Sequence, residues 1–140
     1  MPIAAIDLGA RRIGIAVTDS DGLSVHPLRT IERRSPSADM QAIRDALGSR
    51  SIECLVVGLP INMDGSEGPP ARHARNFAAR LAQAMGIEVH LQDERLSSIE
   101  AEDRLRGSTT RRGKKKHAID AVAAAVILEE YLKMKGPRRA

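Results

Sequence analysis

Apolar residues in the first third of the chain form short runs or alternate with polar residues, which predicts strands. Residues 3–7 are a short, mostly apolar run and indicate a buried strand. Residues 12–18 carry isoleucine or valine at every second position, a period of two that is typical of a strand. A third strand is expected at 23–32, with Pro27 near a sheet edge or a bulge.

Beyond this region, helical and strand patterns alternate. We expect helices at about 38–48, 69–85, 99–105 and 117–134, and strands at 52–57 and 87–92. Three strands in succession followed by alternating elements predict an α/β fold. Its mixed five-stranded sheet would have three antiparallel strands, then two parallel ones, and helices on both faces. With 140 residues and neither a repeat nor a linker, the chain is expected to be one domain, 1–140.

The composition narrows the function classes. The only aromatic residues are Phe77 and Tyr131, which argues against a protein that binds single strands by stacking bases on aromatic rings. The net charge is +4, and positive residues gather between Arg104 and His117, where seven Lys or Arg occur without an acid. Residues 106–116 are expected to form a mobile basic loop.

This basic stretch is compatible with either a solvated loop or a phosphate-binding segment that orders on nucleic acid. In the second interpretation, the residues that contact the phosphate backbone are Arg111, Arg112, Lys114, Lys115 and Lys116.

Cysteine usage and hydropathy suggest a compartment. Cys54 is the only cysteine, lies in an apolar run and is expected to be a buried thiol, which suits a reducing environment. No stretch approaches the length of a membrane span, and the N-terminus does not resemble a signal peptide. A cytoplasmic protein without a membrane partner is therefore expected.

Three acidic positions could converge on one site. Asp7 interrupts an apolar strand, where a carboxylate is costly unless it is paired or binds metal. Glu94 follows Asp93 where the last strand leaves the sheet, and Asp120 begins the apolar part of the last helix. Converging carboxylates suit Mg²⁺ or Mn²⁺ and phosphodiester hydrolysis.

Each acid also has a simpler interpretation. Asp7 could accept hydrogen bonds from a turn, Asp93 and Glu94 could be solvated, and Asp120 could stabilise a helix N-terminus. Asp64 is a weaker candidate, in a loop that leads to another helix N-terminus.

Four blocks of residues, in order and over nearly the whole chain, resemble the YqgF (RuvX-type) family, known as Holliday junction resolvases and pre-16S rRNA nucleases. They are Ala5-Ile6-Asp7-Leu8-Gly9 with Arg12-Ile13-Gly14-Ile15-Ala16; Val56-Val57-Gly58-Leu59-Pro60 with Asn62-Met63-Asp64-Gly65-Ser66-Glu67-Gly68; Asp93-Glu94-Arg95-Leu96-Ser97-Ser98 with Glu100-Ala101; and Lys116 with Ile119-Asp120-Ala121-Val122-Ala123-Ala124.

The resemblance implies an RNase H-like fold, a cytoplasmic protein and a role in maturing the 5′ end of 16S rRNA. It also implies that Asp7, Glu94 and Asp120 are the catalytic, metal-binding acids. Related enzymes carry another acid on the strand beside the first one, but here the expected neighbour strand, 52–57, ends in Gly58. Glu94 would then have to provide the second ligand.

We therefore expect a Mg²⁺- or Mn²⁺-dependent nuclease that acts on structured nucleic acid, with pre-rRNA and ribosomal precursor particles as partners. One alternative is a resolvase that cuts branched DNA, which should be a dimer; an RNA nuclease could be a monomer or a weak homodimer. Another alternative is a non-catalytic nucleic-acid- or ribosome-binding module. A third, half of a sugar-kinase-like ATPase, would need a second domain.

Overall fold

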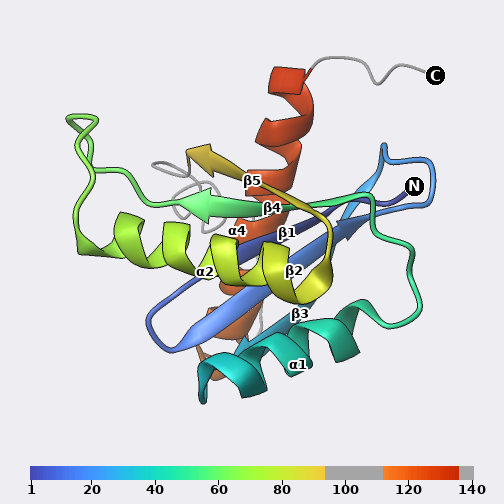
Figure 1. Ribbon diagram of the computed structural model, residues 1–140, viewed down its shortest axis with the longest axis horizontal. Coiled ribbons are helices and arrows are strands. Elements are labelled where there is room, and N and C mark those ends of the chain that lie inside the picture. Colours follow the sequence, from blue (N-terminus) through green and yellow to red (C-terminus); the bar gives the residue numbers. More distant parts are fainter. Residues whose placement is uncertain (94–111, 136–140) are drawn as a thin grey trace.

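The fold is built on one five-stranded sheet, seen in a computed structural model that describes residues 1–93 and 112–135 (Figure 1). In spatial order the strands are β3-β2-β1-β4-β5. β1 pairs antiparallel with β2, and β2 with β3, while β4 lies parallel to both β1 and β5. This arrangement confirms the predicted mixed sheet. The strands are β1 (Ala4–Leu8), β2 (Arg12–Thr18), β3 (Val25–Glu32), β4 (Cys54–Leu59) and β5 (Glu88–Asp93).

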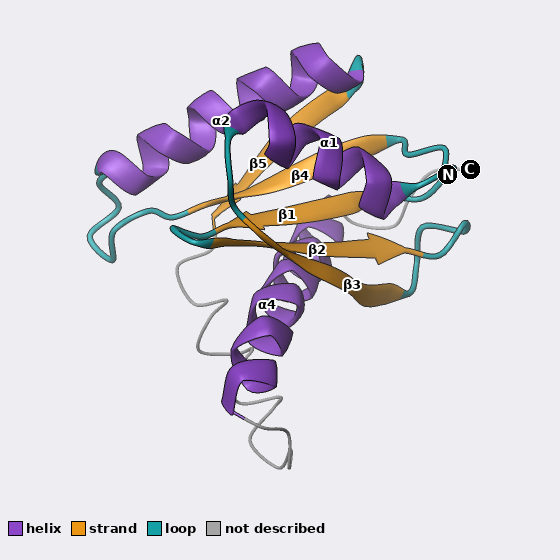
Figure 2. Cartoon of the chain, turned by 90° about the horizontal axis from the view of Figure 1, so that it is seen from below, coloured by secondary structure: helices purple, strands orange, loops and turns teal. Residues whose placement is uncertain are grey.

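Helices cover both faces of the sheet, as predicted (Figure 2). α1 (Pro36–Leu47) and α2 (Pro69–Met85) lie on one face, and α4 (Arg112–Lys135) crosses the other. α1 starts where the Ser35 hydroxyl accepts a hydrogen bond from the Ala38 amide, 3.2 Å away, so one free N–H of the first turn is satisfied. α2 ends at Gly86, whose φ of 68° suits a residue without a Cβ.

The alternation of side chains divides the core into two apolar clusters. Ile6, Ile13 and Val57 point toward α1 and α2, while Ile3 and Ala5 pack with residues 124–131 of α4. The α4 side of β1, β2 and β4 carries small residues: Ala5, Gly14, Ala16, Cys54 and Gly58. Cys54 is 3% exposed, which confirms the expected buried thiol. The small side chains allow α4 to approach the sheet closely.

The edge strand β3 contains the predicted irregularity. Its pairing with β2 shifts between Ile15 and Ala16, and Ala16 lies opposite Pro27. Proline lacks the N–H that a continuous ladder needs, so its place on an edge strand at a bulge follows from its chemistry.

Some element boundaries differ from those expected. α4 begins at Arg112 rather than at 117, so residues 112–116 are helical and not part of a loop. Lysine and arginine are good helix formers, but their charge favours a loop interpretation. β4 extends to Leu59 because Gly58 and Leu59 pair with β5. The expected helix at 99–105 and residues 106–111 lie outside the described residues.

None of the helices in the described ranges 1–93 and 112–135 is long and apolar enough to cross a membrane.

Candidate functional site

Asp7 lies near the carboxyl end of β1, on the face covered by α4. Its neighbours at alternate positions, Ile3 and Ala5, belong to the α4 cluster, and side chains two residues apart share a face of a strand. Asp7 is half-buried. The prediction that this carboxylate lies within a central strand is therefore correct.

Gly14 brings Asp120 next to Asp7. On the neighbouring strand β2, Gly14 is the direct cross-strand partner of Asp7. A Cβ atom built on Gly14 would lie 2.0 Å from the carbonyl oxygen of Asp120 and 2.4 Å from its carbonyl carbon. The α4 backbone thus rests on the glycine itself. The backbone of Asp120 therefore approaches the strand position that pairs with Asp7, although the two acids are more than a hundred residues apart in the sequence.

Asp120 holds an ion pair with Arg12, the first residue of β2. The Nε of Arg12 lies 2.5 Å from Oδ2 of Asp120, and the two side chains are 28% and 22% exposed. Because α4 begins at Arg112, Asp120 stands in the third turn of the helix rather than in the first. The helix macrodipole acts mainly on the terminal turn, so it does not account for an acid at this position.

The last two residues of β5, Gln92 and Asp93, face opposite sides of the sheet. Gln92 is buried and its Nε2 lies 3.2 Å from the Met134 sulfur in α4, so Gln92 faces the side of Asp7. Asp93 follows it and therefore faces the opposite side. On β4, which lies between β1 and β5, Gly58 is the direct cross-strand partner of Gln92. Glu94, the third predicted ligand, lies outside the described residues.

The predicted phosphate-binding residues belong to the start of α4 or precede it. Arg111 lies outside the described residues. Arg112 and Lys114 to Lys116 are helical, and only their backbone is described. These positions therefore lie in the first two turns of α4, and Asp120 follows in the third turn.

The loop between β4 and α2 contains acids with local partners. Asp64 accepts hydrogen bonds from the Ser66 hydroxyl at 2.6 Å and the Ser66 amide at 2.9 Å, which lower the pKa of its carboxyl group. Glu67 accepts two hydrogen bonds from Arg75, at 2.8 and 2.7 Å, and these lower the pKa of Glu67. Both acids thus have a structural task in this loop. In ranges 1–93 and 112–135, no three His, Cys, Asp or Glu side chains form a metal-binding group.

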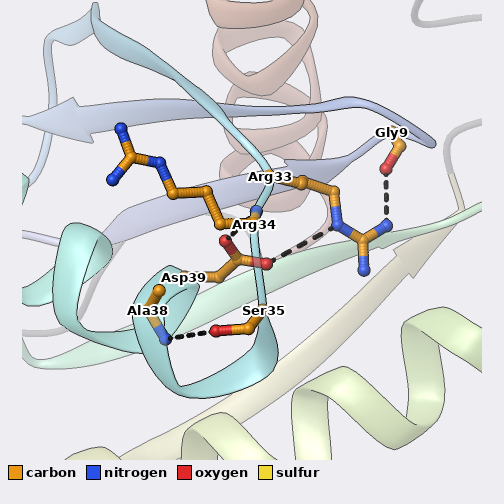
Figure 3. Close-up of polar contacts among 6 residues, drawn as sticks. All are labelled: Gly9, Arg33, Arg34, Ser35, Ala38 and Asp39. Carbon is orange, nitrogen blue, oxygen red and sulfur yellow. Dashed lines mark hydrogen bonds and ion pairs between the residues drawn. The ribbon is translucent and has the colours of Figure 1, made fainter.

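A tether that sequence reasoning missed fixes the turn between Asp7 and Arg12 (Figure 3). Arg33, just after β3, donates from Nη1 to the Gly9 carbonyl at 2.8 Å, and its Nε lies 3.7 Å from the Asp39 carboxylate. Asp39 is 3% exposed and accepts a hydrogen bond from the Arg34 amide at 2.9 Å. The first turn of α1 therefore holds the β1–β2 turn. No motif in the sequence indicated this contact, because Gly9 lies 24 residues before Arg33.

Arg12 and Gly14 were also missed as site residues. A glycine inside a strand often marks a close approach of another backbone, and this signal was present at Gly14. Arg12 gave no comparable signal, since an arginine at a strand end is usually a solvated residue.

Comparison with known families and proteins gives one consistent result. The family model described as "RuvX: Holliday junction resolvase" matches residues 1–134. A protein of Anaeromyxobacter sp. (strain K), named "Putative pre-16S rRNA nuclease", is 45% identical over 98% of this chain and 100% of its own. A relative of the same name from Synechococcus elongatus is 42% identical over 96% of this chain and 91% of its own.

Solved structures show the same fold at low identity. The RuvC structure of Thermus thermophilus aligns with a TM-score of 0.61 at 17% identity, covering 96% of this chain and 97% of that one. The fowlpox virus Holliday junction resolvase aligns with a TM-score of 0.59 at 10% identity, over 97% and 100% of the two chains. The predicted RNase H-like fold is thereby confirmed.

Proposed function

Since this chain belongs to the RuvX family, we propose that it is a metal-dependent nuclease that processes the 5′ end of pre-16S rRNA. Relatives with 42–45% identity over nearly the whole chain carry the name "Putative pre-16S rRNA nuclease". The proposal is supported chiefly by the contact of the Asp120 backbone in α4 with Gly14, the cross-strand partner of Asp7. Phosphodiester hydrolysis needs carboxylates gathered in this way.

The donor set fits Mg²⁺ or Mn²⁺. Asp7 and Asp120 offer carboxylate oxygens, which these hard cations prefer, and both side chains are accessible from solvent. Asp7 would be the central ligand, with Asp120 and Glu94 on either side of it.

The chain's own groups supply binding and orientation. A bound cation would supply an activated water and stabilise the oxygen that leaves the phosphorus. Asp7 and Asp120 would orient that cation, and the tether of Arg33 and Asp39 keeps the intervening β1–β2 turn in place. Arg111, Arg112 and Lys114 to Lys116 would hold the phosphate backbone of the substrate.

The relatives favour RNA as the substrate. Names that specify pre-16S rRNA come from relatives that are 42–45% identical, whereas the resolvases of known structure are 10–17% identical and share the fold alone. The protein would then act on ribosomal precursor particles in the cytoplasm. Each subunit could act alone, so the protein could be a monomer or a weak homodimer. Cleavage of branched DNA is the alternative; symmetric double cuts would require a dimer.

The proposal is tested by replacing the central acid. Asp7→Asn keeps the size of the side chain and removes its charge, so it should lower cleavage of an RNA with the 16S precursor's 5′ leader by at least about a hundredfold, the scale for loss of a key electrostatic group. Asp19→Asn is the matched control, because Asp19 lies in the β2–β3 turn and pairs with His26. Unchanged cleavage by Asp7→Asn would contradict the proposed site.

A further inference from the structure

Arg12 is hydrogen-bonded to a carboxylate oxygen of Asp120 that would otherwise be available to a metal ion. Its Nε donates to Oδ2 at 2.5 Å, and about a quarter of each side chain is exposed. The ion pair links α4 to the first residue of β2, close to the cross-strand pair of Asp7 and Gly14. The Arg12 guanidinium and a divalent metal ion would repel each other at the Asp120 carboxylate, because both are positively charged. They would therefore compete for it.

The remaining donors of Arg12 suit a phosphate. A guanidinium group carries five N–H donors in a planar fork, and the ion pair with Asp120 uses only the one on Nε. Among the described residues, the two Nη groups make no other hydrogen bond or ion pair. Arginine binds phosphate oxygens with two parallel hydrogen bonds, so this side chain has the donors to bind a nucleic-acid backbone close to the acids.

We infer that Arg12 is an internal counter-ion of Asp120 that competes with the divalent cation and moves to a substrate phosphate when the cation binds. This inference rests on the proposed nuclease function and adds a residue to it. It predicts weak metal binding in the free protein. It also predicts that nucleic acid strengthens metal binding, and that metal strengthens nucleic-acid binding by the same factor, because the two equilibria are linked.

The first test measures Mn²⁺ affinity without nucleic acid, from the loss of the free Mn²⁺ signal in electron paramagnetic resonance. Arg12→Gln should bind Mn²⁺ about threefold to tenfold more tightly than the wild type, as expected for removal of a unit positive charge at contact distance. Arg12→Lys keeps the charge and should stay near the wild type. Arg11→Gln is the matched control: Arg11 is the exposed neighbour, and solvent screens its charge.

The second test repeats the titration with a short phosphorothioate oligonucleotide. The oligonucleotide should tighten Mn²⁺ binding to the wild type and have a smaller effect on Arg12→Gln. Equal Mn²⁺ affinity in wild type and Arg12→Gln, or equal enhancement in both, would overturn the inference. Thermal melting of each variant establishes that it is folded.

Neither readout depends on turnover. A protein that shows these effects but cuts no nucleic acid would refute the nuclease and leave the role of Arg12 intact. A protein that cuts RNA while Arg12→Gln binds Mn²⁺ like the wild type would refute only the role of Arg12.

Discussion

At the scale of single residues, the candidate site depends on a glycine, Gly14. Gly14 leaves room for the α4 backbone at Asp120, at the strand position that pairs with Asp7. The acids themselves could be predicted, because a carboxylate in an apolar strand or helix is costly unless it has a task. Their proximity could not be predicted, since it depends on how closely two distant backbone segments approach.

Gly14→Ala tests this contact. The added Cβ would lie far inside the contact distance of the Asp120 carbonyl, so α4 must shift, and overpacking of this kind costs about 1–3 kcal/mol. Urea unfolding should show that loss, and cleavage should fall with it. Gly68→Ala is the control, because its Cβ would have no neighbour nearer than 3.7 Å. Wild-type stability in Gly14→Ala would show that α4 does not rest on this residue.

Replacing Asp39 tests the tether, because Asp39 contacts both Arg33 and the Arg34 amide. Asp39→Ala leaves the Arg34 amide without its acceptor and removes the ion-pair partner of Arg33, so it should destabilise the fold by about 1–3 kcal/mol, measured by urea unfolding. Asp45→Ala removes an exposed acid from the same helix, whose partner is Gln41, and should change stability by less than about 0.5 kcal/mol. A similar loss in both variants would mean that the tether contributes nothing specific.

At the scale of elements, periodicity predicted the strands well and the helix ends less well. The period of two in β2 and the apolar run of β4 reflect burial, which the sequence records directly. The start of α4 was placed too late because Arg112 to Lys116 are both good helix formers and strongly charged. Composition alone does not decide between these two properties.

The loop before α2 offers an acid-sensitive contact. Two hydrogen bonds from Arg75 lower the pKa of Glu67 in the folded protein. A group with a lowered folded pKa stabilises the fold above its ordinary pKa, and the contribution disappears as the pH falls through the folded value. Glu67→Gln should therefore melt slightly below the wild type at neutral pH, and the difference should vanish in acid. A difference that grows as the pH falls would contradict this assignment.

At the scale of the whole molecule, Asp7 and Asp120 lie on the α4 side of the sheet, and a basic segment forms the start of α4. The mixed sheet with helices on both faces followed from the order of strand and helix patterns, and RuvC-like structures confirm it. The Arg12–Asp120 pair and the hydrogen bond from Arg33 to Gly9 did not follow, because contacts between segments 108 and 24 residues apart have no sequence period.

The basic segment should make nucleic-acid binding depend on salt. Replacing Lys114, Lys115 and Lys116 by glutamine should reduce the slope of log K against log salt concentration by about 2–3, since each phosphate contact contributes roughly 0.7–0.9. The triple variant Arg72→Gln, Arg80→Gln, Lys133→Gln has the same change in charge at exposed positions on α2 and the far end of α4, and should keep most of the slope. Equal slopes in the two triple variants would refute the proposed role of the segment.

The most direct test of the central claim is cleavage by the pure protein of two labelled substrates, an RNA with the 16S precursor's 5′ leader and a four-way DNA junction. Each is incubated with Mn²⁺, with Mg²⁺ and with a chelator. We predict metal-dependent cleavage of the RNA and little or none of the junction. Binding of both substrates without cleavage of either, at any metal concentration, would contradict the account and favour a non-catalytic module on the same fold.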